Sequence, residues 1–294
     1  MHAIVRSARP PFLVLTPICV LLGFSMANYY GAEPRINLLG IILIGALGAH
    51  LSVNWLNEYQ DFASGLDLLT ERTPFSGGSG ALPEHPKAAL SVLYAGITSL
   101  LITCAIGGWL LFQHSAVLLP FGLIGVLLVV TYTQWINRMP WLCLIAPGLG
   151  FGLLMTQGTH LLFNPQLPAA SWWIAAIPFL LINNLLLLNQ YPDLEADRNS
   201  GRKHFPIRYG IATSNLALLA SAVGAYAILT GLLVQNAVPP LTAIAYVPAG
   251  LALIAVFGAF RYGAQIGAHP PLMACNVAAA CLTPLSISIA LKLG

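Results

Sequence analysis

The sequence predicts an all-α, polytopic membrane protein, because apolar residues dominate the chain and gather in long segments. Of the 294 residues, 57% are hydrophobic and only 7% are charged. The mean hydropathy is +0.80. A soluble globular protein of this length needs far more polar surface. We therefore expect most of the chain to lie in lipid as transmembrane helices.

Nine stretches of the sequence are long and apolar enough to span a membrane, which takes about 20 residues. They lie at residues 11–30, 37–57, 90–112, 115–133, 142–162, 170–189, 213–235, 239–260 and 273–292. They leave no separate soluble domain, so residues 1–294 are interpreted as a single transmembrane domain. Arg6 and Arg9 lead into the first stretch without a small-residue cleavage site, which favours a retained helix over a signal peptide.

The basic residues predict the orientation of the chain. When the connections between spans are numbered in order, ten of the twelve lysines and arginines fall on one side. Only Arg35 and Lys292 fall on the other side. By the positive-inside rule, the first side is cytoplasmic. The long connections after the second and sixth spans also lie there, so we expect an active site on the cytoplasmic side of a cell membrane, the inner membrane in a bacterium.

The acidic residues are concentrated in those two long connections. The chain has nine aspartates and glutamates, and all except Glu33 lie in them. The eight are Glu58, Asp61, Asp67, Glu71, Glu84, Asp193, Glu195 and Asp197. A membrane protein without a polar site would scatter its acids over several loops. We therefore expect the two connections to build one site.

The first acidic cluster begins at the cytoplasmic end of the second span. If the helix continues for one more turn, Asn57 and Asp61 are four residues apart and share a face. Gly65 suits a turn. This turn would bring Asp67 and Arg72 back over the mouth of the helix bundle.

The second cluster repeats the pattern at the end of the sixth span. Asn189, Asp193 and Asp197 follow one another at intervals of four residues, which predicts one stripe along a helix. Asn189 comes 132 residues after Asn57, with four spans from one cluster to the next. Both clusters should therefore emerge on the same face, as in an internal repeat.

Two facing sets of amide and carboxylate oxygens predict a magnesium site rather than a zinc site. Magnesium is usually held by one or two carboxylates together with substrate phosphates, so a diphosphate is expected to bridge the clusters. Basic residues beside the acids would bind its phosphate oxygens. These residues are Arg72, Arg198, Arg202 and Lys203.

The residues alone leave other interpretations open. Charged residues are normal at the ends of membrane helices, and basic residues among acids can form solvated ion pairs. A secondary transporter or channel also combines many helices with polar residues, although no charged residue lies in the middle of a predicted span. A diphosphate phosphatase, a prenyltransferase with a non-quinone acceptor and a structural membrane protein are further alternatives. The five cysteines lack metal-site spacing and are interpreted as packing residues.

With these motifs, the sequence resembles the UbiA superfamily of intramembrane prenyltransferases. That superfamily has an Asn-Asp-xx-Asp loop and an Asp-xxx-Asp loop, and the clusters beginning at Asn57 and Asp193 are similar to them. Residues 57–67 are most similar to the 1,4-dihydroxy-2-naphthoate polyprenyltransferase (MenA-type) branch, and residues 73–80 share its character. The sequence departs from the family at Glu58, where Asp is usual, and at residues 201–205, where Gly-Lys-x-Thr-Leu is commoner.

The resemblance implies a fold and a reaction. The fold is a ring of nine helices around a central cavity, with a lateral opening to lipid for an isoprenoid tail. The reaction is magnesium-assisted transfer of a prenyl group from an isoprenoid diphosphate to an aromatic acceptor. The expected acceptor is 1,4-dihydroxy-2-naphthoate or a related quinone precursor, with 4-hydroxybenzoate or a specialised metabolite as the alternative. Neither a nucleic acid nor a protein partner is implied.

The resemblance also assigns roles to individual residues. The residues expected to hold magnesium are Asn57, Glu58, Asp61, Asp193 and Asp197. Among the acids, the expected catalytic residues are Asp61, Asp67 and Asp193. Asn189 would support the second cluster and the bound substrate, while Arg72, Arg202 and Lys203 would contact phosphate oxygens.

Overall fold

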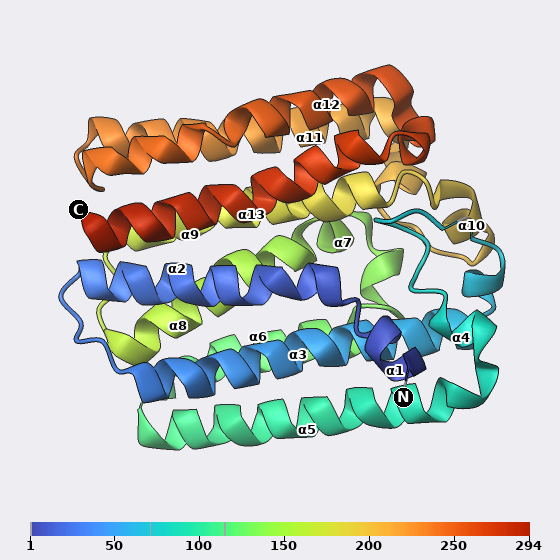
Figure 1. The fold of residues 1–294 in the computed structure, drawn as a ribbon, viewed down its shortest axis with the longest axis horizontal. Coiled ribbons are helices and arrows are strands. Elements are labelled where there is room, and N and C mark those ends of the chain that lie inside the picture. The colour runs from blue at the N-terminus through green and yellow to red at the C-terminus, as the bar shows by residue number, and fades with distance from the viewer. Residues whose placement is uncertain (1, 71, 115) are drawn as a thin grey trace.

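The computed structural model describes residues 2–70, 72–114 and 116–294. In these ranges the regular secondary structure is helical, and the long helices run along the longest axis of the molecule (Figure 1). The predicted all-α class is confirmed. Glu71, one of the clustered acids, and residue 115, the first of the predicted fourth span, lie outside the described residues.

In the described chain, eight helical segments are long and apolar enough to cross a membrane. Six of them consist mainly of one α-helix each: α2 (Leu15–Tyr29), α3 (Ile36–Ala63), α5 (Ala89–Gln113), α9 (Ala169–Asn189), α11 (Phe205–Val234) and α13 (Pro270–Leu293). The predicted fourth span is a shorter apolar helix, Ala116–Thr131, most of which is α6 (Leu119–Thr131). Each of the nine predicted stretches thus coincides with an apolar helix.

The other two spans are composite. The first joins α7 (Pro140–Pro147) and α8 (Thr156–Phe163) through the π-helical segment Gly148–Met155. The second contains α12 (Ala249–Tyr262), preceded by the 3-10 helix Pro240–Tyr246. Proline is the first residue of α7 and of this 3-10 helix, where its missing N–H has no helical partner to lose.

Apolar packing holds α2, α9 and α13 together on one side of the molecule. Leu22 and Met26 of α2, Ile177 and Leu181 of α9 and Ile287 of α13 belong to one cluster of buried side chains. On the other side, α3 packs along α5. A cavity is lined mainly by α3, α5, α6, α9 and the π-helical segment, with a smaller contribution from α7 and α8.

Three short α-helices that belong to no span lie at one end of the bundle. The chain begins there, and α1 (His2–Ser7), α4 (Ala81–Glu84) and α10 (Leu194–Asn199) lie at that end, whereas the C-terminus lies at the other (Figure 1). Arg6 of α1 forms an ion pair with Glu84 of α4. Both acidic clusters lie at this end of the bundle, as their positions in the sequence predict.

A backbone break at Gly210 divides α11 into a short first part and a long second part. Gly210 has φ 82° and ψ 166°, a conformation that other residues rarely adopt. The helix therefore changes direction just before Ile211. The long second part contains the apolar stretch predicted at residues 213–235, and the helix as a whole begins earlier, at Phe205.

We expect the end of the bundle that carries the acids to face the cytoplasm. Alkaline phosphatase, which is active only outside the cytoplasm, should be active when fused after Lys292. Green fluorescent protein, which fluoresces only in the cytoplasm in this assay, should be bright when fused after Lys87. Phosphatase activity after Lys87 together with bright fluorescence after Lys292 would show that the orientation is the reverse.

Candidate active site

The first acidic cluster forms the end of α3, as the sequence predicts. The helix continues to Ala63, so Asn57 and Asp61 lie one turn apart, and both line the large cavity. The chain turns at Gly65, whose φ of 78° suits glycine. Asp67 follows in a short 3-10 helix, where it is buried and lines the same cavity.

The second acidic cluster does not form the continuous helical stripe that its spacing predicts. α9 ends at Asn189, and Asp193 immediately precedes a separate helix, α10, which carries Asp197. Pro192 explains the break, because proline has no N–H to donate and disfavours a helical conformation in the preceding residue. The stripe was therefore a wrong prediction. Even so, Asn189, Asp193 and Asp197 all line the cavity.

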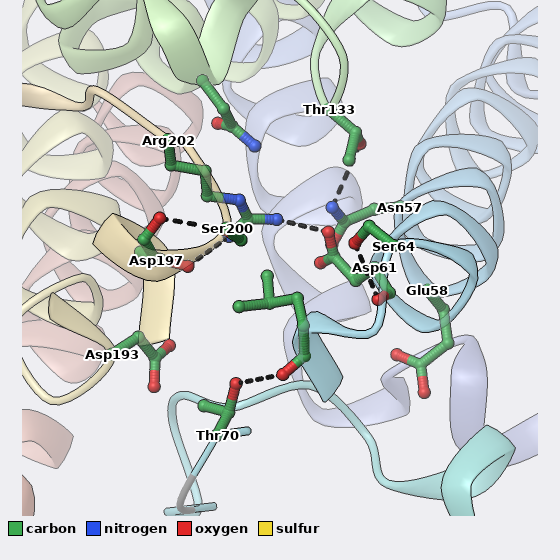
Figure 2. Close-up of polar contacts among 12 residues, drawn as sticks. Asn57, Glu58, Asp61, Ser64, Thr70, Thr133, Asp193, Asp197, Ser200 and Arg202 are labelled. Carbon is green, nitrogen blue, oxygen red and sulfur yellow. Dashed lines mark hydrogen bonds and ion pairs between the residues drawn. The ribbon is translucent and has the colours of Figure 1, made fainter. Parts of the chain in front are cut away.

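Arg202 connects the two clusters. Its guanidinium forms ion pairs with Asp61 of the first cluster and with Asp197 Oδ1 of the second, the latter at 2.8 Å (Figure 2). Burial alone would lower the pKa of Arg202, but the attraction of these two carboxylates raises it above its usual value. Arg202 thus remains charged, and its fork of N–H donors holds the clusters together across the cavity.

Asp197 is fully engaged by neighbouring side chains. Its Oδ1 accepts the hydrogen bond from Arg202, and its Oδ2 lies 2.8 Å from Nε2 of His204. His204 is 1% exposed and also lines the cavity. This carboxylate therefore fixes the positions of Arg202 and His204.

Asp67 and Asp193 are less completely paired. Oδ2 of Asp67 and Oδ1 of Asp193 are buried without a hydrogen-bond partner among the described residues. Burial, together with the charges of Glu58 and Asp61, raises the pKa of Asp67 to about 7. Burial and the charge of Asp197 raise the pKa of Asp193 to about 7. Unpaired buried carboxylates are costly, so both would be stabilised by a cation.

These oxygens fit magnesium bound together with a diphosphate. Among the described residues, no three histidine, cysteine, aspartate or glutamate side chains are close enough to hold a metal ion by themselves. Magnesium commonly takes only one or two carboxylates and completes its octahedron with phosphate oxygens and water. The free oxygens of Asp67 and Asp193 and the amide of Asn57 on the same cavity wall provide such a partial set.

Four residues assigned to the site by sequence lie outside the cavity wall. Glu58 is buried, and Figure 2 shows its carboxylate apart from the Arg202 contacts. Arg72 is exposed and lies 3.5 Å from Glu84 in an ion pair. Arg198 and Lys203 are exposed. The spacing could not separate these residues from their neighbours, because one position along a helix or loop turns a side chain away from the cavity.

Glu58 instead fastens the loop that covers the cavity. Its Oε2 accepts hydrogen bonds from Arg9 Nη2 and from the backbone N–H of Ser79, each at 3.2 Å. The hydroxyl of Ser79 donates to its Oε1. Further along the same loop, the N–H of Gly77 donates to Asp193 Oδ2 at 2.9 Å. Residues 76–79 are thus attached to both acidic clusters.

Sequence reasoning did not assign three features of the cavity wall. Arg9 lines the cavity, although its position before the first span predicts no role in the site. His204 lies in residues 201–205, which depart from the family pattern, and its contact with Asp197 joins residues seven apart. Ser76, Gly77 and Gly78 also line the cavity. The run of small residues at 76–80 was the available signal for a close backbone approach.

The cavity has a volume of about 730 Å³ and divides into a polar and an apolar part. The polar part contains the residues described above. The apolar part follows α3 from Val53 to Ile42 and includes Leu110, Phe121 and Phe151 from other helices. From Asp61 to Ile42 the helix rises by roughly 28 Å, which is close to the thickness of the hydrocarbon core of a bilayer, about 30 Å.

The raised pKa values predict how stability depends on pH. In the metal-free folded protein, Asp67 and Asp193 keep a proton at pH values where an unfolded carboxyl, with pKa 3.8, has lost it. Protonation of these two carboxyl groups therefore stabilises the folded state. This stabilisation is complete below about pH 4 and is lost as the pH rises through about 7. EDTA-treated protein should therefore melt at a lower temperature at about pH 8 than at about pH 6. Asp67→Asn should reduce the difference between these two melting temperatures. An unchanged difference in this variant would contradict the raised pKa of Asp67.

Comparisons with known proteins identify the family. Residues 16–286 match the UbiA prenyltransferase family. The chain is 27% identical over 235 residues to a 1,4-dihydroxy-2-naphthoate octaprenyltransferase of Bacillus subtilis (strain 168), a match that covers 79% of this chain and 74% of that protein.

Solved structures show the same fold. A UbiA homolog from Archaeoglobus fulgidus bound to GPP and Mg²⁺ has a TM-score of 0.68 at 15% identity, over 99% of both chains. Bound to DMAPP and Mg²⁺, it has a TM-score of 0.67 at 15% identity, over 98% of both. The chain therefore belongs to the UbiA prenyltransferase family and is a membrane-spanning prenyltransferase.

Proposed function

We propose that the protein transfers a prenyl group from an isoprenoid diphosphate to 1,4-dihydroxy-2-naphthoate or a closely related quinone precursor. The division of the cavity is the observation that carries this proposal. One end holds four aspartates and Arg202, and the rest of the wall is largely apolar. An isoprenoid diphosphate is divided in the same way, into a charged headgroup and a hydrocarbon tail.

The polar end is suited to a diphosphate bound with magnesium. Asn57 and Asp61 from the first cluster and Asp193 from the second would hold the ion, with the free oxygen of Asp67 close to them on the wall. Asp197 would hold Arg202 in place. When bound, magnesium neutralises the charge that develops on the leaving diphosphate. The related A. fulgidus protein holds Mg²⁺ with GPP or DMAPP, which supports this arrangement.

The side chains of the protein supply the remaining requirements of the reaction. Arg202 and Arg9 line the polar end and can donate N–H groups to phosphate oxygens. The amide of Asn189 is available in the same place. As the bond between the allylic carbon and the diphosphate oxygen breaks, the apolar wall keeps water away from the carbocation.

A ring carbon of the acceptor then forms the new carbon–carbon bond. If that carbon carries a carboxylate, its loss as carbon dioxide restores the aromatic ring without an added base. The B. subtilis relative is named as a 1,4-dihydroxy-2-naphthoate octaprenyltransferase, and this supports a carboxylated naphthalene as the acceptor. The cytoplasmic face of a bacterial inner membrane would give such a water-soluble acid access to the polar end of the bundle.

Mass spectrometry of the product tests this proposal. Membranes containing the protein would be incubated with an isotope-labelled prenyl diphosphate and a panel of aromatic acids, with membranes lacking the protein as the control. We expect label in a prenylated product of dihydroxynaphthoate that has lost carbon dioxide. A labelled product of 4-hydroxybenzoate alone would contradict the acceptor, and no labelled product with any acid would overturn the proposed function.

A further inference from the structure

A second pocket lies beside the polar end of the large cavity. It has a volume of about 470 Å³ and is formed by the end of α3, the segment after α6 and the segment after α10. Most of the residues around it are polar, in contrast to the wall of the large cavity. Asp61 and Arg202 line both spaces. The pocket therefore borders on the reaction site.

Two side-chain contacts lie at the boundary between the pocket and the cavity. Nδ2 of Asn57, which lines the cavity, donates to Oγ1 of Thr133, which lines the pocket, at 3.0 Å. The second contact is the ion pair between Asp61 and Arg202. Both are drawn in Figure 2, near the end of α3.

The pocket carries groups that suit an aromatic acid. Arg138 lines it and forms no ion pair with any acid that the structure describes, so its charge is available to a carboxylate. Trp135 is 63% exposed and, with Tyr59, offers an aromatic surface to a ring. Oε1 of Gln60 is buried without a partner among the described residues and could accept a hydrogen bond from a ring hydroxyl.

We propose that this pocket binds the hydroxylated aromatic acid on its way from water to the reaction cavity. The acid would enter the cavity past the Asn57–Thr133 and Asp61–Arg202 contacts, whereas the isoprenoid would arrive from the lipid. This inference rests on the proposed function, because it assumes an aromatic acid as the acceptor. It adds an entry site whose residues, apart from Asp61 and Arg202, lie outside the reaction cavity.

Two substitutions test the entry site by steady-state kinetics. Arg138→Gln removes the free cation, and Ala63→Trp fills the pocket from the last residue of α3. Each should lower kcat/KM for the aromatic acid by about tenfold. Each should leave kcat at saturating acid and KM for the prenyl diphosphate unchanged. The matched controls are Arg261→Gln at the end of α12 and Leu68→Trp at the exposed end of the 3-10 helix Leu66–Leu68. Both positions lie outside the two spaces, and both variants should behave like wild type.

A binding measurement without turnover complements the kinetics. Addition of the aromatic acid alone should quench tryptophan fluorescence in the wild type, and Trp135→Phe should remove part of that quenching. Trp173→Phe, at an exposed position on α9, serves as the control. Melting temperatures would establish that each variant is folded.

The outcomes separate the entry site from the proposed function. A wild type that transfers label to no aromatic acid would defeat the proposed function itself. If the wild type is active but both pocket variants keep full kcat/KM for the acid, the entry site is wrong. The entry site is also wrong if the variants raise KM for the prenyl diphosphate as much as KM for the aromatic acid. It is wrong as well if they change only the inhibition by inorganic diphosphate, because the pocket would then be an exit for that product.

Discussion

Asp193→Ala and Asp61→Ala should each reduce prenyl transfer by at least about a hundredfold, the order of effect seen when one electrostatic contact to a developing charge is removed. The two carboxylates are 132 residues apart in the sequence but line one polar end of the cavity. Asp193 has a buried oxygen free for a cation, and Asp61 is held by Arg202. Loss of either would leave the leaving diphosphate incompletely neutralised. Turnover of labelled prenyl diphosphate measures the effect.

The double variant separates a shared role from two independent roles. If both aspartates act in one ionisation step, Asp61→Ala combined with Asp193→Ala should be little worse than either single variant. Glu33→Ala, an exposed acid outside the cavity wall, should retain wild-type turnover. Losses that simply multiply in the double variant would show that the two clusters act separately.

Arg202→Gln should abolish turnover and also destabilise the protein. The Arg202 side chain is 18% exposed, and the carboxylates of Asp61 and Asp197 are 8% and 3% exposed. Removing the guanidinium leaves both buried charges without their shared partner, which typically costs about 3–5 kcal/mol. Arg202→Lys keeps the charge but cannot contact both carboxylates with a planar fork, so it should recover stability only in part. Melting temperature and label transfer measure the two effects.

Arg198→Gln is the matched control for this experiment. Arg198 lies four residues earlier in the same segment and was assigned to phosphate binding by sequence, but it is exposed and outside the cavity wall. We expect it to retain the melting temperature and turnover of the wild type. A loss in Arg198→Gln as large as that in Arg202→Gln would contradict the distinction that the structure makes between the two arginines.

Most of the fold could be predicted because the requirements of a bilayer are simple. A helix in lipid needs a long apolar run, and each such run in the sequence coincides with an apolar helix in the described chain. The continuation of α3 past Asp61 and the turn at Gly65 were also predictable, since they depend only on local spacing and on glycine. These features involve residues that are close in sequence.

The rest of the site depends on contacts that spacing does not specify. The interval from Asn189 to Asp197 fits a helix, but Pro192 stops that helix between them. Glu58 is next to a cavity residue in sequence, yet its partners are Arg9 and Ser79, which come from distant parts of the chain. The pairing of Arg202 with Asp61 spans 141 residues. Only the tertiary arrangement distinguishes these roles.

Metal dependence of label transfer tests the central claim most directly, namely that both acidic clusters serve one magnesium-assisted ionisation of an isoprenoid diphosphate. Purified protein would be assayed with labelled prenyl diphosphate and dihydroxynaphthoate before EDTA treatment, after it, and after excess Mg²⁺ is added back. We expect transfer at the start, none in EDTA and recovery with Mg²⁺, while Asp193→Ala stays inactive throughout. Full transfer in EDTA, or by Asp193→Ala, would contradict it and indicate a structural role for these acids.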